Sequence, residues 1–167
     1  MDSGKGHERG SQDQEVGKVM KKIGTYTARG TIYEAGSNPQ KINLFDGVFD
    51  TAYRIKSITV APYEINATSN YNYAVKVMTN NEGNAALWNW SDQAEVAWAY
   101  TSFDANGISN PPFSSVDKDQ LIVEDAYIYL EATQPLIANY EIVFEKYAIS
   151  DWQGALAMAR ERQSHEQ

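Results

Sequence analysis

The stretch "YNYAVKV", residues 71–77, carries the clearest strand pattern in this 167-residue chain. Its four large apolar residues occupy every second position, and Asn72, Ala74 and Lys76 lie between them. Because successive side chains of a β-strand point to opposite faces, this pattern predicts a strand with one buried face and one solvated face. Half-solvated strands of this kind are typical of antiparallel sheets.

Similar short runs continue in both directions from this stretch, separated by clusters of Gly, Asn, Pro and Asp. Such spacing is typical of an all-β, antiparallel β-sandwich, here expected to be jelly-roll-like. In residues 53–65 the apolar phase changes near Lys56 and Ser57, which predicts a β-bulge. Residues 119–133 and 138–149 are two long runs with Pro135 between them, and we expect them to pair as a hairpin.

The chain divides into three predicted parts. Residues 1–18 are polar and without period, and we expect a flexible N-terminal arm. Residues 19–149 form the predicted β-sandwich domain. Residues 150–167 are predicted to form a short C-terminal amphipathic α-helix and tail, because Ser150 and Gln153 match a capping box.

Composition argues against several classes of function. The net charge is −8 and the isoelectric point is about 4.7, so nucleic acid and anionic membranes are unfavourable partners. The chain has no Cys, and its two histidines, His7 and His165, lie in the predicted arm and tail. We therefore expect no catalytic triad, no cofactor and no metal site, and a protein that is not an enzyme. We also expect a soluble protein, since no signal peptide or membrane-spanning run is evident.

The tryptophans are the strongest candidates for ligand contact. Trp88 and Trp90 are predicted to share one face of a short strand over residues 85–90, where exposed rings could stack on sugars. The other interpretation is that they fill the sandwich interior or a subunit interface. Trp98, in phase with Val96 and Tyr100, is expected to fill the interior.

The predicted C-terminal helix has one apolar stripe. An isolated helix of this length is marginal in water, so the stripe must pack against the sandwich of its own chain or against a neighbouring subunit. The candidate interface residues are Trp152, Ala155, Leu156, Met158 and Ala159.

Residues 140–163, "YEIVFEKYAISDWQGALAMARERQ", combine the pattern Y-x-I-x-x-E-K-Y with I-S-x-W-x-G-A-L-A and an Arg-rich end. This segment resembles the ending of small virion structural proteins of marine tailed bacteriophages. The resemblance implies a capsid decoration or cement protein on the outer surface of the head. Its partners would be copies of itself, as a homo-oligomer, and a capsid lattice or another virion protein. The alternative function is a carbohydrate-binding β-sandwich module, or a host-recognising fibre or tail component.

Overall fold

The computed structural model describes residues 20–34, 38–65, 70–104, 110–133 and 136–150. This part of the chain is all-β and contains no helix. None of the described residues forms a helix of the length and apolarity that a membrane crossing requires. The predicted arm and, apart from Ser150, the predicted C-terminal helix lie outside the described residues. The strands are β1 (Lys21–Tyr33), β2 (Gln40–Ile42), β3 (Thr51–Pro62), β4 (Tyr71–Met78), β5 (Glu95–Phe103), β6 (Phe113–Val116), β7 (Ala126–Ala132) and β8 (Ile137–Ala148).

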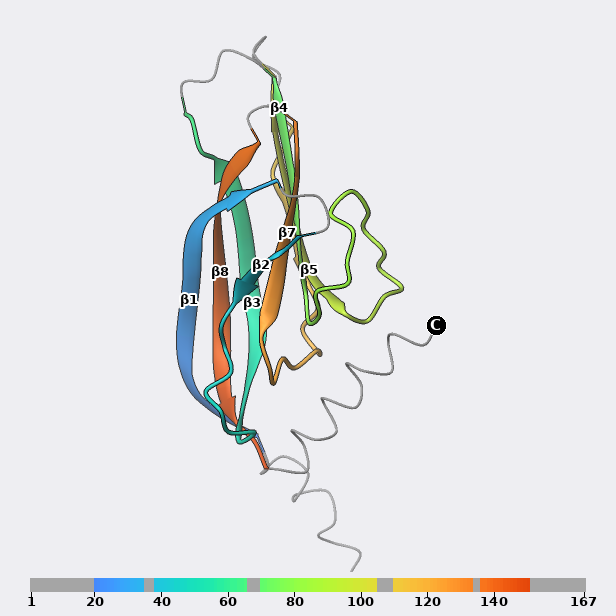
Figure 1. The fold of residues 1–167 in the computed structure, drawn as a ribbon. Coiled ribbons are helices and arrows are strands. Elements are labelled where there is room, and N and C mark those ends of the chain that lie inside the picture. Colours follow the sequence, from blue (N-terminus) through green and yellow to red (C-terminus); the bar gives the residue numbers. More distant parts are fainter. Residues whose placement is uncertain (1–19, 35–37, 66–69, 105–109, 134–135, 151–167) are drawn as a thin grey trace, which may run out of the picture.

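The strands form two antiparallel sheets that pack face to face, as in a β-sandwich (Figure 1). The three-stranded sheet has the order β1-β8-β3, and the five-stranded sheet has the order β2-β7-β4-β5-β6. The predictions of an all-β chain and of antiparallel pairing are therefore confirmed for the described part of the chain.

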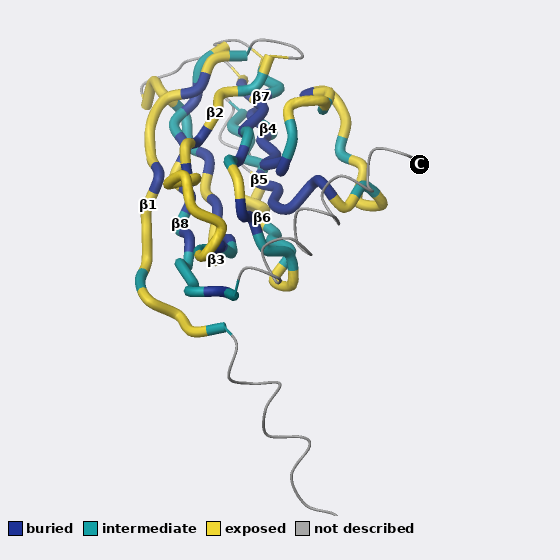
Figure 2. Tube along the Cα trace, turned by 60° about the horizontal axis from the view of Figure 1, so that its bottom comes forward, coloured by how far each residue is buried: buried dark blue, intermediate teal, exposed yellow. Residues whose placement is uncertain are grey.

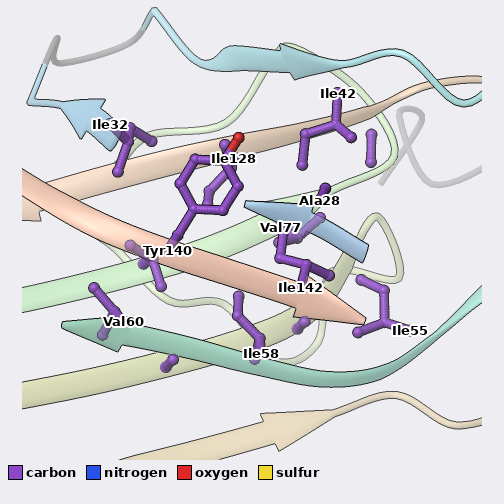
Figure 3. Packing of buried hydrophobic residues seen from close by; sticks show 14 of the residues in the cluster. Ala28, Ile32, Ile42, Ile55, Ile58, Val60, Val77, Ile128, Tyr140 and Ile142 are labelled. Carbon is purple, nitrogen blue, oxygen red and sulfur yellow. The ribbon is translucent and has the colours of Figure 1, made fainter. Parts of the chain in front are cut away.

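The main core lies between the two sheets (Figure 3). The three-stranded sheet contributes residues such as Ile55, Ile142 and Phe144, and the five-stranded sheet contributes Val77 and Ile128. All five are at most 2% exposed. Burying an apolar side chain of this size stabilises a fold by roughly 1.5–3 kcal/mol, so the alternating pattern of β4 and β8 is what binds the two layers together.

Strand β1 forms one edge of the three-stranded sheet and is largely exposed along its length (Figure 2). Only Ala28 and Ile32 of this strand are buried. Tyr26, which has the same alternation phase as Ala28 and Ile32, is 44% exposed. The strand is therefore attached mainly by its backbone pairing with β8.

The predicted bulge in β3 is confirmed. The pairing of β3 with β8 shifts register between Ile55 and Ser57, so that Lys56 has no partner opposite it. The extra residue explains why both Ile55 and Ile58 are buried although their spacing breaks a strict alternation.

The predicted hairpin of β7 and β8 is wrong. β8 pairs with β1 and β3, whereas β7 pairs with β2 and β4 in the other sheet. Alternation along a strand specifies which face is buried, but not which strand supplies the hydrogen bonds. Here the partners come from distant parts of the chain, and the connection after β7 crosses from one sheet to the other.

One further pairing lies beside β3, where Tyr53 and Ile122 form an isolated antiparallel bridge. The backbone N–H of each residue donates to the carbonyl oxygen of the other at 2.8 Å. Ile122 follows β6 in the chain, so the segment after β6 moves from the edge of the five-stranded sheet to the edge of the three-stranded sheet.

Candidate ligand-binding site

Four residues form a continuous row across the outer face of the five-stranded sheet. Glu131 of β7 pairs with Ala74 of β4, Ala74 pairs with Tyr100 of β5, and Tyr100 pairs with Phe113 of β6. Their sequence neighbours on β4, Tyr73 and Val75, belong to the core, so the row faces away from the three-stranded sheet. The row places a carboxylate at one end and aromatic rings at the other, with a small residue between them.

The loop between β4 and β5, residues 79–94, stands on this outer face (Figure 1). The strand predicted over residues 85–90 is absent. Instead, four side chains, those of Asn80, Asn84, Asn89 and Asp92, each accept a hydrogen bond from the backbone N–H two residues later, at 2.9–3.2 Å. Such local bonds favour successive turns over an extended strand, and the spacing of Asn and Asp was the sequence signal for them.

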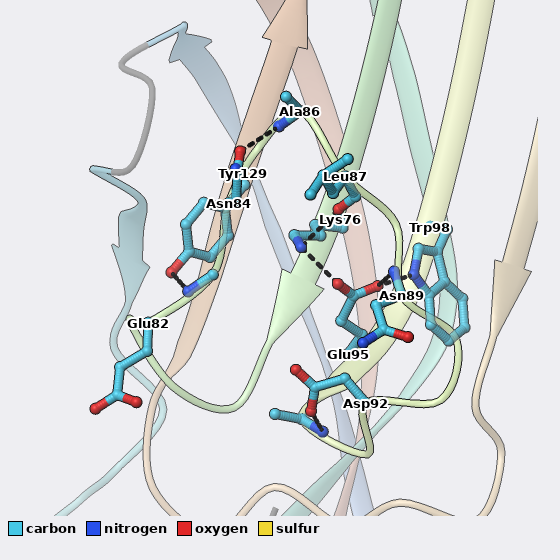
Figure 4. Close-up of polar contacts among 12 residues, drawn as sticks. Lys76, Glu82, Asn84, Ala86, Leu87, Asn89, Asp92, Glu95, Trp98 and Tyr129 are labelled. Carbon is cyan, nitrogen blue, oxygen red and sulfur yellow. Dashed lines mark hydrogen bonds and ion pairs between the residues drawn. The ribbon is translucent and has the colours of Figure 1, made fainter. Parts of the chain in front are cut away.

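A buried ion pair attaches this loop to the sheet (Figure 4). The Nζ of Lys76 donates to Oε1 of Glu95 at 2.5 Å and to the carbonyl oxygen of Leu87 at 2.8 Å. The other carboxylate oxygen of Glu95 accepts from the backbone N–H of Asn89 and from Nε1 of Trp98. Lys76 was predicted to face solvent and is 2% exposed, because the loop covers its end of the sheet.

Trp98 is buried, but not in the sandwich interior as the sequence pattern predicts. It lies opposite Lys76 on the outer face, while Ala97 and Ala99 belong to the main core. A register shift between Val77 and Met78 in the pairing of β4 with β5 precedes this stretch. The residues of β5 that face the core are therefore not the ones predicted from the positions of its aromatic residues.

Three exposed or half-buried rings gather above Trp98. Trp90 and Phe113 lie nearly parallel, with ring centroids 6.3 Å apart and an angle of 12° between their planes. Trp88 contacts Phe113 at 5.9 Å between centroids, and Trp90 contacts Trp98 at 5.4 Å. Trp90 is 62% exposed and Phe113 is 39% exposed. Exposed aromatic surface gathered in one place is a mark of ligand or partner contact.

A pocket of about 370 Å³ lies directly beside the rings. Ala74 lies between Glu131 and Tyr100 in the cross-strand row, and its small side chain lines the pocket. The remaining lining residues are Ala85, Ala86, Trp88, Tyr100, Phe113 and Glu131. Apolar surface with a few polar groups is the usual composition of a small-molecule site.

The structure thus places both predicted sugar-stacking residues in one aromatic cluster, on a loop rather than on a strand. Trp88 lines the pocket and Trp90 extends the exposed surface beside it. Sequence reasoning missed Glu131, Tyr100 and the role of Phe113, because cross-strand register brings them together. The predicted interface residues, Trp152, Ala155, Leu156, Met158 and Ala159, lie outside the described residues.

The adjacent acidic residues Glu124 and Asp125 lie in different environments, Glu124 exposed and Asp125 half-buried. Asp125 accepts hydrogen bonds from the backbone N–H groups of Leu44 and Phe45 and pairs with Lys41 at 2.6 Å. Partial burial opposes ionisation of Asp125, but the hydrogen bonds from Lys41 and the two backbone groups together hold its pKa below the usual value. Asp125 therefore anchors the segment after β2.

Within the described ranges, no three His, Asp or Glu side chains come together in a way that could hold a metal ion. Comparison of the chain with protein-family models, with curated proteins and with solved structures found no match.

Proposed function

We propose that this protein is a non-enzymatic, carbohydrate-binding β-sandwich module of the kind that a host-recognising component uses. The observation that carries the proposal is the cluster of Trp88, Trp90 and Phe113 beside the pocket on the outer face of the five-stranded sheet. The apolar faces of sugar rings stack on such aromatic side chains, and Tyr100 and Glu131 supply polar groups for hydroxyls.

The dimensions of the site suit a short oligosaccharide. The row from Glu131 to Phe113 crosses three strand spacings, which corresponds to about 14 Å. The exposed face of Trp90 continues the apolar surface beyond the pocket. A ligand with several rings could therefore fill the pocket with one ring and stack another on the exposed cluster.

Contacts within the protein also hold the side chains of the proposed site. The ion pair of Lys76 and Glu95 and the turns of the 79–94 loop hold Trp88 and Trp90 against Phe113. Preorganised side chains lose little conformational freedom on binding, so more of the stacking energy appears as affinity.

Affinity electrophoresis of the full chain through gels that contain neutral, amino-bearing or acidic polysaccharides tests this proposal. We expect retardation by at least one polysaccharide, and a loss of about tenfold in affinity for Trp88→Ala and for Trp90→Ala. Leu87→Ala is the matched control, because Leu87 is 62% exposed on the same loop and has no ring. The proposal is wrong if no polysaccharide retards the protein, or if Leu87→Ala weakens retardation as much as the tryptophan variants.

We propose a virion structural protein as the second candidate function, with the sandwich being a jelly roll. The support is the nested pairing of β1 with β8, β2 with β7 and β4 with β5, together with the bridge between Tyr53 of β3 and Ile122 after β6. Jelly rolls occur in viral capsid proteins and in lectins. A decoration or cement protein on the head shell, or a sugar-binding virion component, fits this pairing.

Light scattering on the full chain tests the second candidate. A subunit that works by contact with copies of itself and a shell should form an oligomer, and Trp152→Ala with Leu156→Ala should shift it toward monomers. Aromatic residues of this kind commonly dominate interface energies. A full chain that stays monomeric at all concentrations and does not bind purified shells would rule the candidate out.

A further inference from the structure

Glu131 is the one acidic residue among those that line the pocket, and none of the lining residues is basic. It is half-buried at the end of the cross-strand row, beside Ala74. Among the described residues, its carboxylate has no hydrogen bond and no ion pair. A partly desolvated carboxylate without a partner is unfavourable, and a ligand that neutralises it would recover that cost.

The nearest basic residue along β4 cannot serve as this partner. Lys76 lies two residues from Ala74 on the same face, but its ammonium is bound to Glu95 and to the carbonyl oxygen of Leu87. The buried ion pair therefore leaves the negative charge of Glu131 uncompensated within the described part of the site.

The other walls of the pocket also favour a cation. Trp88, Tyr100 and Phe113 line the same pocket as Glu131. Aromatic faces attract cations through their quadrupoles, and this attraction is strongest where water is partly excluded. The net charge of −8 raises the local concentration of cationic ligands and lowers that of anionic ones.

We propose that the pocket binds the protonated amine of an amino sugar, with Glu131 as the residue that determines this specificity. The inference rests on the proposed carbohydrate-binding function and names its ligand class. The ammonium group pairs with the carboxylate, while the sugar rings stack on Trp88 and on the exposed rings next to it. Acidic sugars are excluded, because their carboxylates or sulfates would lie against Glu131.

Two ligands that differ in a single group make the test direct. Oligomers of glucosamine carry free amines, and oligomers of N-acetylglucosamine of the same length carry neutral amides on the same ring. Binding of each oligomer to the full chain is measured by calorimetric titration in about 0.15 M salt, which screens attraction by distant charges. The pH is one at which the amine is protonated and carboxylates are ionised. We expect the glucosamine oligomer to bind about tenfold more tightly.

Glu131→Gln should abolish this preference, so that the variant binds the two oligomers with equal affinity. Glu141→Gln is the control for net charge, because Glu141 is exposed on β8 in the three-stranded sheet and its loss should leave the preference intact. Leu87→Ala again serves as the control for the 79–94 loop.

The outcomes separate the inference from the function on which it rests. Equal binding of the two oligomers, or a preference that persists in Glu131→Gln, overturns the assignment of the amine to Glu131 while carbohydrate binding stands. Absence of binding by both oligomers also overturns it, and retardation in the polysaccharide gels then decides the carbohydrate-binding function separately.

Discussion

The Nζ of Lys76 and Oε1 of Glu95 lie 2.5 Å apart, and both side chains are at most 3% exposed. This ion pair is not in the main core but under the 79–94 loop, where it joins β4 and β5 to the residues that carry Trp88 and Trp90. The proposed binding site therefore depends on a polar network that local strand pattern does not reveal.

Lys76→Met should lower the free energy of unfolding by about 3–5 kcal/mol, because it leaves the buried carboxylate of Glu95 without its cation. The double variant Lys76→Met with Glu95→Leu should be less destabilised than the sum of the two single variants. Urea denaturation followed by tryptophan fluorescence measures both quantities. A loss below about 1 kcal/mol in Lys76→Met would mean that the pair contributes little.

Gly83→Ala should destabilise the protein by about 1–3 kcal/mol, since a Cβ atom at this position would overlap Sδ of Met78 and lie 3.0 Å from Cζ of Tyr129. Both neighbours are only 2% exposed and have little room to move. Gly24→Ala is the matched control, because nothing lies within 4 Å of its Cβ position. Thermal unfolding of the two variants should differ accordingly, and equal midpoints would contradict this packing.

Asp125 should make stability depend on pH in the acid range. Its pKa is lowered in the folded state, so its contribution is fully present above the ordinary Asp value of about 3.9 and is lost as pH falls through the lower folded-state pKa. Asp125→Asn should therefore reduce the free energy of unfolding at pH 7 and flatten its decline below about pH 4. Urea midpoints measured across this range, with Glu124→Gln as the exposed control, provide the check.

Tyr73→Phe should raise the free energy of unfolding by about 1 kcal/mol. Tyr73 is fully buried, burial raises the pKa of its phenol, and its hydroxyl has no hydrogen-bond partner within the described residues. Removing an unsatisfied hydroxyl recovers its desolvation cost and leaves the ring packing intact. A destabilised Tyr73→Phe, seen in the same urea experiment, would show that the hydroxyl has a partner.

Local sequence pattern was sufficient to predict features that depend only on which face of a strand packs against the core. The alternation in residues 71–77 predicted the buried face of β4, and the change of phase near Lys56 predicted the bulge in β3. These features follow from the burial of every second side chain along a strand. This period of two is visible in the strand's own sequence.

Long-range pairing determined the rest. The hairpin expected for β7 and β8 failed because their hydrogen-bond partners lie in opposite sheets, and the interior placement of Trp98 failed because the pairing of β4 with β5 shifts register.

The lining of the pocket also depends on long-range strand pairing. Glu131, Ala74, Tyr100 and Phe113 come from four strands and become neighbours only across the hydrogen-bonded sheet. The chain alone specified an acidic, aromatic-rich, all-β protein and singled out Trp88 and Trp90. Which polar and apolar groups surround those rings depended on cross-strand register and on the loop that covers the sheet, because both arise from contacts between residues far apart in the sequence.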